Sequence, residues 1–174
     1  MATPCSTRVI LLTRCDLVEE VALRGMENRI ARVAPAVPVA HSRHRPAVWI
    51  NSAGQTLPLE NAAGRPVAAF CGLGHPEGFR KTLAALGHTP VAWRVYSDHH
   101  AYTSADIDDL RAWARKLPAD AFLATTQKDL VKIGMERLGE RDLWALRIEL
   151  EITRNEGELQ RLLENVQPKT EPEA

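Results

Sequence analysis

The sequence predicts an α/β protein with a mostly parallel sheet and flanking helices. Short apolar runs suited to buried strands alternate along the chain with helical segments, and this alternation indicates parallel strands joined by right-handed crossovers. Polar or glycine-containing loops follow four of the runs. The composition fits a folded domain, because 45% of the 174 residues are hydrophobic and 25% are charged.

The first 45 residues predict one strand and one helix. Residues 8–13 form an apolar run of the kind found in a buried parallel strand. A helix from about Val18 to Val33 follows, with apolar residues at helical spacing that predict a core-facing stripe. Pro35 and Pro38 end this helix, and residues 37–41 predict a short extended stretch at a sheet edge.

The next segments predict a hairpin and then a second run of α/β units. Residues 47–51 and 55–59 flank Ser52-Ala53-Gly54, which indicates a β-hairpin suited to an inter-domain strap. Strands are then expected at 67–71, 90–96, 121–126 and 143–152, and helices at 76–86, 104–117 and 128–133. Pro76 suits a first helical turn, while Thr103 followed by Asp106 is close to a capping box.

The end of the chain predicts a helix and a polar tail. Asn155 is expected to cap a helix that runs to about Val166. Residues 167–174 are polar and proline-rich, so we expect them to be disordered.

Charge and cysteine usage exclude several classes of protein. Lys and Arg number 22, as do Asp and Glu, and this balance argues against a nucleic-acid binder. No apolar run reaches the ~18 residues that span a bilayer, and the N-terminus has no secretory apolar region. The three cysteines show no CxxC spacing, so they are interpreted as reduced thiols in a cytosolic chain.

Four loops are expected to meet at the carboxyl edge of the sheet, where α/β proteins bind ligands. These loops are residues 13–16, 72–76, 97–103 and 125–129. The turn Asp98-His99-His100 is the most informative, because imidazoles titrate near neutral pH. A solvated turn in which Asp98 bonds to backbone remains the alternative. The Gly72–Gly78 segment has GxGxxxG spacing and a proline, which favours a tight strand-to-helix turn, and no GxxxxGK[ST] phosphate loop occurs.

Read in order, these segments resemble the C-terminal half of the tetraacyldisaccharide 4'-kinases, the lipid A 4'-kinases. The resemblance covers roughly residues 8 to 150 and rests on five stretches in family order. They are Leu11–Val18, His44–Pro46, Ala69–Phe79, Asp98–Thr103 and Thr125–Asp129.

The resemblance implies a P-loop-kinase-like C-terminal lobe and an ATP- and Mg²⁺-dependent transfer to the 4'-hydroxyl of a lipid A disaccharide precursor. Residues 1–45 would be the end of the nucleotide-binding lobe, 46–59 the hairpin linker and 60–153 the C-terminal lobe. Residues 154–166 would be the terminal helix, before the tail at 167–174. The protein would be cytoplasmic and peripheral to the inner membrane.

The resemblance also assigns roles to residues of this chain. His99 would be catalytic, helping to deprotonate the sugar hydroxyl, and Asp98 would orient it. Lys128 and Asp129 would bind the nucleotide, Lys128 by countering phosphate charge. An ion pair between these two at the helix start is the structural alternative. Asp16 lies in a Thr-Arg-Cys-Asp sequence that echoes a base-reading loop, and Gly72, Gly74 and His100 would contact substrate.

Two departures from the family pattern matter. The family's phosphate loop, its metal-binding acidic residues and its base aspartate belong to an N-terminal half that these residues do not include, so we expect negligible kinase activity from this polypeptide alone. The family usually carries Glu where this chain has Gln127. A non-catalytic kinase-like module that binds lipid or a partner is the alternative function. An upstream GxxxxGK[ST] in the same or a neighbouring reading frame would favour the enzyme, and an upstream region that lacks it would favour the binding module.

Overall fold

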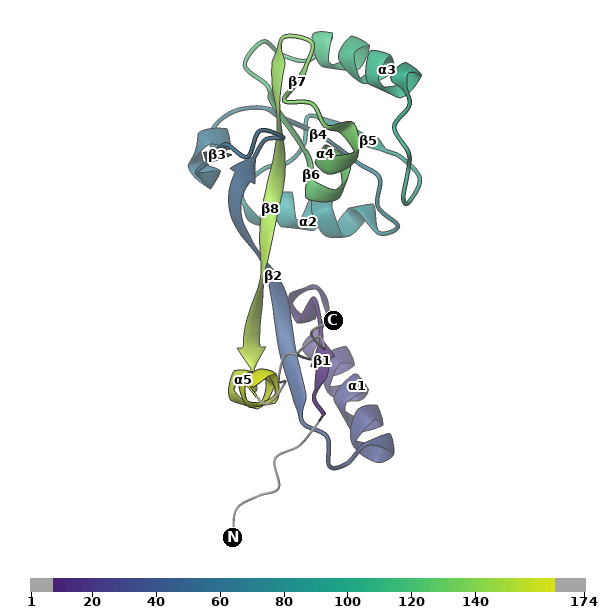
Figure 1. The fold of residues 1–174 in the computed structure, drawn as a ribbon, viewed down its shortest axis with the longest axis vertical. Coiled ribbons are helices and arrows are strands. Elements are labelled where there is room, and N and C mark those ends of the chain that lie inside the picture. The colour runs from purple at the N-terminus through teal and green to yellow at the C-terminus, as the bar shows by residue number, and fades with distance from the viewer. Residues whose placement is uncertain (1–7, 165–174) are drawn as a thin grey trace, which may run out of the picture. The chain divides into compact units, whose positions relative to one another are not determined.

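The computed structural model describes residues 8–164, which form two compact units (Figure 1). The second unit is a continuous stretch, Pro46–Glu149, whereas the first combines the chain up to Arg45 with the chain from Leu150 onward. The strands β2 (Val39–Ile50) and β8 (Arg141–Arg154) each belong partly to both units. The structure thus groups 46–59 with the second unit and 150–164 with the first. The predicted tail at 167–174 lies outside the described residues.

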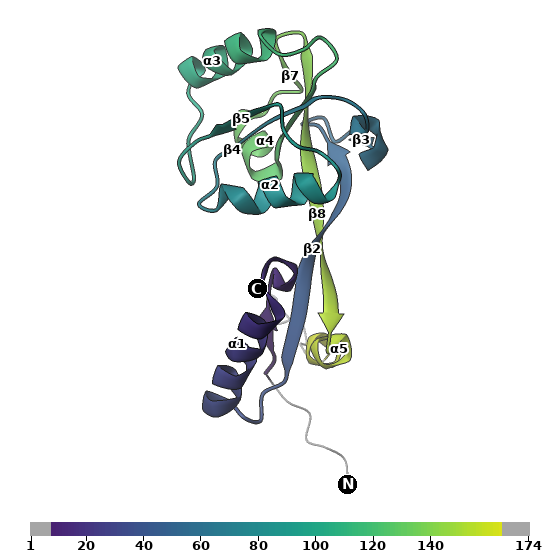
Figure 2. The ribbon, with the colours of Figure 1, turned by 180° about the vertical axis from the view of Figure 1, so that it is seen from behind.

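The first unit contains β1 (Ile10–Leu12), α1 (Glu20–Val33), part of β2, the end of β8 and α5 (Glu156–Glu164). β1 pairs in parallel with β2, with Ile10 opposite Val39, and Figures 1 and 2 both show α1 alongside these strands. Three described side chains of this unit are buried, namely Ala40, His41 and Ser42. Because α1 buries none of its residues and leaves Val21 and Val33 exposed, its apolar stripe does not face a core.

Charged contacts hold the elements of the first unit together. Glu27 of α1 lies 2.9 Å from Nε2 of His41 on β2 and 2.5 Å from Arg154 at the end of β8. Arg43 donates two hydrogen bonds to the carboxylate of Glu151, at 3.0 and 2.9 Å. Asn155 precedes α5 in a left-handed conformation, and its Nδ2 donates to the carbonyl oxygen of Val39.

The second unit is built on a parallel sheet in the order β8-β6-β4-β5. Its inner strands are β4 (Val67–Cys71) and β6 (Phe122–Thr126), and β5 (Ala92–Val95) forms the edge. On the other side, β2 lies next to β8 and pairs antiparallel with β3 (Thr56–Leu57), while β7 (Arg137–Leu138) pairs antiparallel with β8. The predicted α/β class with a mostly parallel sheet is confirmed.

Helices cover both faces of this sheet. Alternate residues of β4 point to opposite faces, since Phe70 packs with α3 (Ser104–Arg115) and α4 (Gln127–Ile133), and Ala69 packs with α2 (Pro76–Ala85). Every residue of β4 is buried, as expected for an inner parallel strand. Figure 1 shows α2 and α3 on opposite sides of the strands.

Several predicted elements differ from the structure in extent. The stretch predicted at 37–41 and the first hairpin strand predicted at 47–51 are joined in one long strand, β2, which runs without a break from Val39 to Ile50. The first strand is shorter than the predicted 8–13, and a short 3-10 helix at Cys15–Leu17 precedes α1. The last strand is longer than the predicted 143–152.

The capping box of α3 gives a first testable prediction. The Thr103 hydroxyl accepts a hydrogen bond from the backbone N–H of Asp106, whose carboxylate accepts one from the N–H of Thr103. Thr103→Ala removes the cap, so we expect the free energy of unfolding to fall by about 1 kcal/mol in urea titrations. Ser104→Ala, one residue later, is the control and should change it by less than about 0.5 kcal/mol. Equal stability of the two variants would contradict the cap.

Candidate functional site

The candidate site lies where the connections from two neighbouring strands diverge. β4 and β6 are adjacent and parallel, but the helix after β4 packs on one face of the sheet and the helix after β6 packs on the other. Such a switch point leaves a crevice at the carboxyl ends of the strands, which is where open α/β sheets bind ligands. The loops after β4, β5 and β6 meet there, as predicted for three of the four polar loops.

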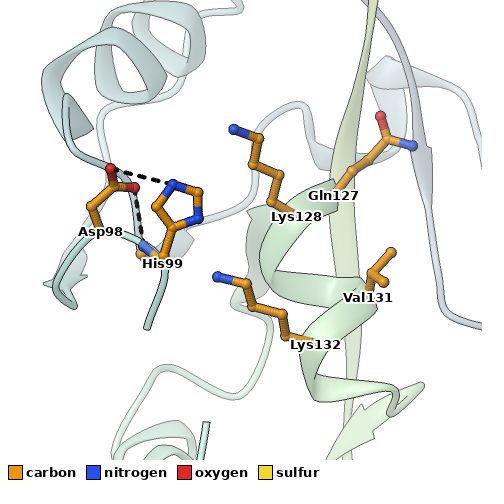
Figure 3. A pocket seen from close by; sticks show the side chains of 7 residues that line it. Asp98, His99, Gln127, Lys128, Val131 and Lys132 are labelled. Atoms are coloured by element: carbon orange, nitrogen blue, oxygen red, sulfur yellow. Dashed lines mark hydrogen bonds and ion pairs between the residues drawn. The ribbon is translucent and has the colours of Figure 1, made fainter. Parts of the chain in front are cut away.

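A pocket of about 520 Å³ occupies this position (Figure 3). The loops after β4 and β5 contribute Gly72, Asp98 and His99. The helix α4 contributes Gln127, Lys128, Val131 and Lys132. Of the four ionisable residues that line this pocket, three were candidate site residues in the sequence, namely Asp98, His99 and Lys128. Lys132 was not, although its place four residues after Lys128 in a predicted helix puts both on one face.

His99 reaches the pocket from a conformation that most residues avoid. Its φ of 57° is left-handed, a region that costs a non-glycine residue roughly 1 kcal/mol. Asp98 supports this turn, because its Oδ1 accepts a hydrogen bond of 3.0 Å from the N–H of His99. Its Oδ2 lies 3.7 Å from Nε2 of the same imidazole, which is 80% exposed. Asp98 therefore bonds to the backbone, as expected for a solvated turn, and also lies beside the imidazole, as expected if it orients His99.

Lys128 and Lys132 face the histidine from α4. Figure 3 shows both side chains extending from the helix toward Asp98 and His99. Neither lysine forms an ion pair with a carboxylate among residues 8–164. The predicted alternative, an ion pair between Lys128 and Asp129, is therefore wrong. The physical reason is that Asp129 points into the core, whereas the exposed side chain of Lys128 extends into the pocket.

Asp129 is a buried structural carboxylate in this structure. It is 0% exposed, and its Oδ2 accepts hydrogen bonds from the Thr126 hydroxyl at 2.6 Å and from the N–H of Gly72 at 3.0 Å. Its backbone N–H lies 3.3 Å from the Thr126 hydroxyl, which caps α4. Asp129 thus ties the loop after β4 to the loop after β6. It does not line the pocket, so its predicted contact with nucleotide stays a prediction that this placement does not favour.

The glycines of the loop after β4 permit two close approaches. A Cβ on Gly72 would lie 3.0 Å from Oδ1 of Asp129 and 3.3 Å from the carbonyl oxygen of Ser97. A Cβ on Gly74 would lie 2.9 Å from Oδ2 of Asp98. The tight turn predicted here is present, and Gly72 also lines the pocket.

His100 is held away from the pocket by its neighbours. Its Nε2 lies 3.1 Å from Oδ2 of Asp106, and its ring stacks on Tyr96 at 4.7 Å between centroids and meets Tyr102 edge-on at 5.0 Å. These contacts support a structural role that orders the loop after β5. The predicted substrate contact of His100 stays a prediction.

Asp16 belongs to the first unit and is described there. It is the exposed residue of the 3-10 helix Cys15–Leu17. The hydrogen bond to Glu151 raises the pKa of Arg43, and the charge of Asp16 adds a smaller effect in the same direction. The same carboxylate opposes the lowering of the His44 pKa, which burial and then Arg14 cause. Its predicted role in base recognition stays a prediction.

Three weakly acidic side chains beside the site ionise less readily than usual. Burial raises the pKa of the Cys71 thiol to about 12, and burial together with the Asp129 charge raises the pKa of Tyr102. Burial also raises the pKa of Tyr96. Above about pH 9 the unfolded chain loses these protons while the folded chain keeps them, so the folded state binds more protons and stability falls as pH rises.

The difference in proton binding between the folded and unfolded chain gives a second testable prediction. The free energy of unfolding should decrease above about pH 9, by about 1.4 kcal/mol per pH unit for each such group once its unfolded form ionises. Urea titrations from about pH 8 to about pH 10.5 measure the decrease, and Cys71→Ala should remove the contribution of the thiol. Constant stability of the native chain over that interval would contradict the assignment.

The described residues offer no cluster for a metal ion and no membrane span. Among residues 8–164, no three His, Cys, Asp or Glu side chains lie close enough together to hold a metal. Within the same residues, every helix is too short or too polar to cross a bilayer.

The structure is an α/β lobe with a pocket at the carboxyl edge of its parallel sheet, and two lysines and one histidine line that pocket. The family profile LpxK, tetraacyldisaccharide-1-P 4'-kinase, matches residues 8–167. The chain belongs to this family.

Relatives and a solved structure agree with the family match. The chain is 34% identical over 157 residues to the tetraacyldisaccharide 4'-kinase of Anaeromyxobacter sp. (strain Fw109-5), a match that covers 90% of the chain and 42% of that protein. It is 39% identical to that of Rhodopseudomonas palustris (strain BisA53), covering 86% of the chain and 43% of the relative. The chain thus spans about two-fifths of the length of these relatives.

The fold is that of a solved member. A crystal structure of LpxK from Aquifex aeolicus in complex with ATP aligns with a TM-score of 0.54 and 23% identity, covering 90% of the chain and 51% of the crystallised one.

Proposed function

We propose that this chain is the C-terminal, acceptor-side part of a tetraacyldisaccharide 4'-kinase, which transfers the γ-phosphoryl group of ATP to the 4'-hydroxyl of a lipid A disaccharide precursor. One observation carries the proposal: in the pocket of this chain, His99 lies beside Asp98 and faces Lys128 and Lys132. The chain also belongs to the family of these kinases. An imidazole opposite two ammonium groups suits deprotonation of a hydroxyl next to a phosphoryl group.

The transfer needs one proton acceptor and countercharge. The bond from the 4'-oxygen to the γ-phosphorus forms, the bond from that phosphorus to the β,γ-bridging oxygen breaks, and ADP leaves. His99 assists removal of the hydroxyl proton together with an aspartate from the rest of the longer protein. Asp98 stabilises the left-handed turn that presents the imidazole, because it accepts a hydrogen bond from the N–H of His99. Lys128 counters the charge on the phosphoryl oxygens as a point charge.

The described residues fit a phosphate group better than a metal ion. The two lysines have no carboxylate partner in residues 8–164, and such ammonium groups attract phosphate oxygens. For Mg²⁺, which prefers clustered carboxylate oxygens, these residues supply no cluster. We therefore derive no step here through a metal, and we assign its ligands and the phosphate loop to the remainder of the longer protein.

The first unit supports the proposal that a longer protein completes this chain. Its helix α1 buries no residue, and its described side chains provide almost no apolar core. A helix of this kind normally gains its stability by packing an apolar face. The relatives are more than twice as long as the matched segment. The acylated acceptor would bring the complete protein to the cytoplasmic surface of the inner membrane as a peripheral enzyme.

A chimaera tests the proposed function. The matching segment of the R. palustris relative is replaced by residues 8–164 of this chain, and transfer of labelled γ-phosphate to a tetraacyldisaccharide 1-phosphate is measured. A second chimaera carrying the Anaeromyxobacter segment controls for the junction. We expect both to be active. Activity in the control alone, with the first chimaera folded, would favour the non-catalytic binding module.

The isolated chain gives a third testable prediction. Without the phosphate loop, positioning and charge neutralisation of the γ-phosphoryl group are incomplete, so we expect no ATP-dependent phosphorylation of the disaccharide at any Mg²⁺ concentration. Thin-layer separation of radiolabelled products detects any transfer. Clear turnover by the 174-residue chain would contradict its assignment as one part of a larger enzyme.

A further inference from the structure

We propose that Lys128 and Lys132 together form a two-point site for a terminal phosphate group, either of a sugar phosphate or of a nucleotide, with His99 as a third donor. The site deepens the proposed function, on which its biological meaning rests, by naming the group that the pocket holds and by assigning a role to Lys132. The binding itself is a property of this chain and can be measured without any transfer reaction.

The two ammonium groups project from one side of α4. Residues four apart lie one above the other on a helix, and both lysines line the pocket. Figure 3 shows the two side chains parallel, directed toward the imidazole of His99 on the opposite wall. Three nitrogen donors from two elements therefore face one space. A terminal phosphate group, in an ester or at the end of ATP, has three non-bridging oxygens, which gives each donor an acceptor.

The residues that line the pocket carry more positive than negative charge. Like charges four residues apart on a helix repel each other, and neither lysine is paired with a carboxylate in the described chain. A bound anion would therefore offset the weak repulsion between the two lysines.

The nearby acidic groups do not neutralise the pair. Asp98 is the one carboxylate that lines the pocket, and one of its oxygens already accepts from the N–H of His99. Asp129 is fully buried behind the pocket wall and bonds to Gly72 and Thr126. Two ammonium groups and an imidazole thus face a single carboxylate, and this excess of positive charge favours an anionic ligand.

The space around the lysines suits a phosphate that is attached to a larger group rather than free inorganic phosphate. The pocket of about 520 Å³ exceeds what inorganic phosphate fills. Val131, which is 81% exposed, lies between the two lysines in the sequence and leaves an apolar surface beside them. A phosphate attached to a larger group would use both features. That phosphate belongs either to the nucleotide or to the sugar.

Titrations of the 174-residue chain test the site. Amide chemical shifts are followed by NMR during addition of inorganic phosphate, N-acetylglucosamine 1-phosphate or metal-free ATP. We expect saturable shifts at residues 127–132 and at His99. Lys132→Ala should weaken binding about fivefold, which is the upper range for one ion pair at a surface. Lys132→Arg should retain binding, and Lys116→Ala, at the exposed end of α3, should leave it unchanged.

The outcomes separate the two sources of phosphate and the two proposals. Tighter binding of ATP than of the sugar phosphate would assign the site to the donor, and the reverse would assign it to the acceptor. Either result supports the site. Native affinity in the Lys128→Ala, Lys132→Ala double variant, or shifts that never saturate, would overturn it. An inactive chimaera with intact phosphate binding would reject the proposed kinase function and leave this site standing.

Discussion

Replacement of Asp129 by alanine is expected to lower the free energy of unfolding by about 3 kcal/mol, the largest loss that we predict for a polar side chain of this protein. The carboxylate is 0% exposed and accepts hydrogen bonds from the Gly72 N–H and the Thr126 hydroxyl. Its removal leaves the buried N–H of Gly72 and the half-buried hydroxyl of Thr126 without this acceptor, and an unpaired buried group costs about 1–3 kcal/mol. Urea unfolding of the variant measures the loss.

The matched control is Asp108→Ala, which removes an exposed carboxylate that pairs with Arg111 on the surface of α3. This change should alter stability by less than about 1 kcal/mol. Asp129→Asn keeps an acceptor oxygen in place and should fall between the two. If Asp129→Ala were as mild as the control, the carboxylate would not be the tie between the loops after β4 and β6.

The second large effect is catalytic and concerns His99 in the active chimaera. His99→Ala should lower kcat by about 10²–10⁴ with a modest change in KM, because general-base assistance acts in the transition state and contributes little to substrate binding. Initial rates at saturating ATP and varied disaccharide provide both constants. The fold of the variant is checked by its far-UV circular dichroism.

His75→Ala is the control for the loss of an imidazole. His75 precedes α2, is exposed and does not line the pocket, so kcat should be unchanged. A second variant, His99→Gln, keeps a polar side chain but cannot take up the proton, and should be as slow as His99→Ala. Near-native kcat in both His99 variants would remove this residue from the mechanism.

Elements with one dominant local signal were predicted well from the sequence. The apolar run Val67–Cys71 is an inner strand, and Thr103 with Asp106 caps α3. β2 was predicted as two separate stretches because its middle carries polar and basic residues. Those residues are stabilised by partners far away in the sequence, as Arg43 is by Glu151, and no local pattern indicates such pairing.

The candidate site shows the same division. Three polar loops and the pocket positions of His99 and Lys128 followed from strand order and residue type. The burial of Asp129 did not, because its sequence position at a helix start equally suits a solvent-facing acid. Its partner Gly72 is 57 residues away, and the space between them exists only because Gly72 has no side chain.

The division of the chain into units has a consequence for its synthesis. The second unit is uninterrupted from Pro46 to Glu149, but the first also needs the end of β8 and α5, which are translated after the second unit. At about 5–20 residues per second, roughly a hundred residues separate the two halves of the first unit by about 5–20 seconds on the ribosome. During that interval Glu27 of α1 lacks its partner Arg154, and Arg43 of β2 lacks its partner Glu151. The second unit is therefore expected to fold first.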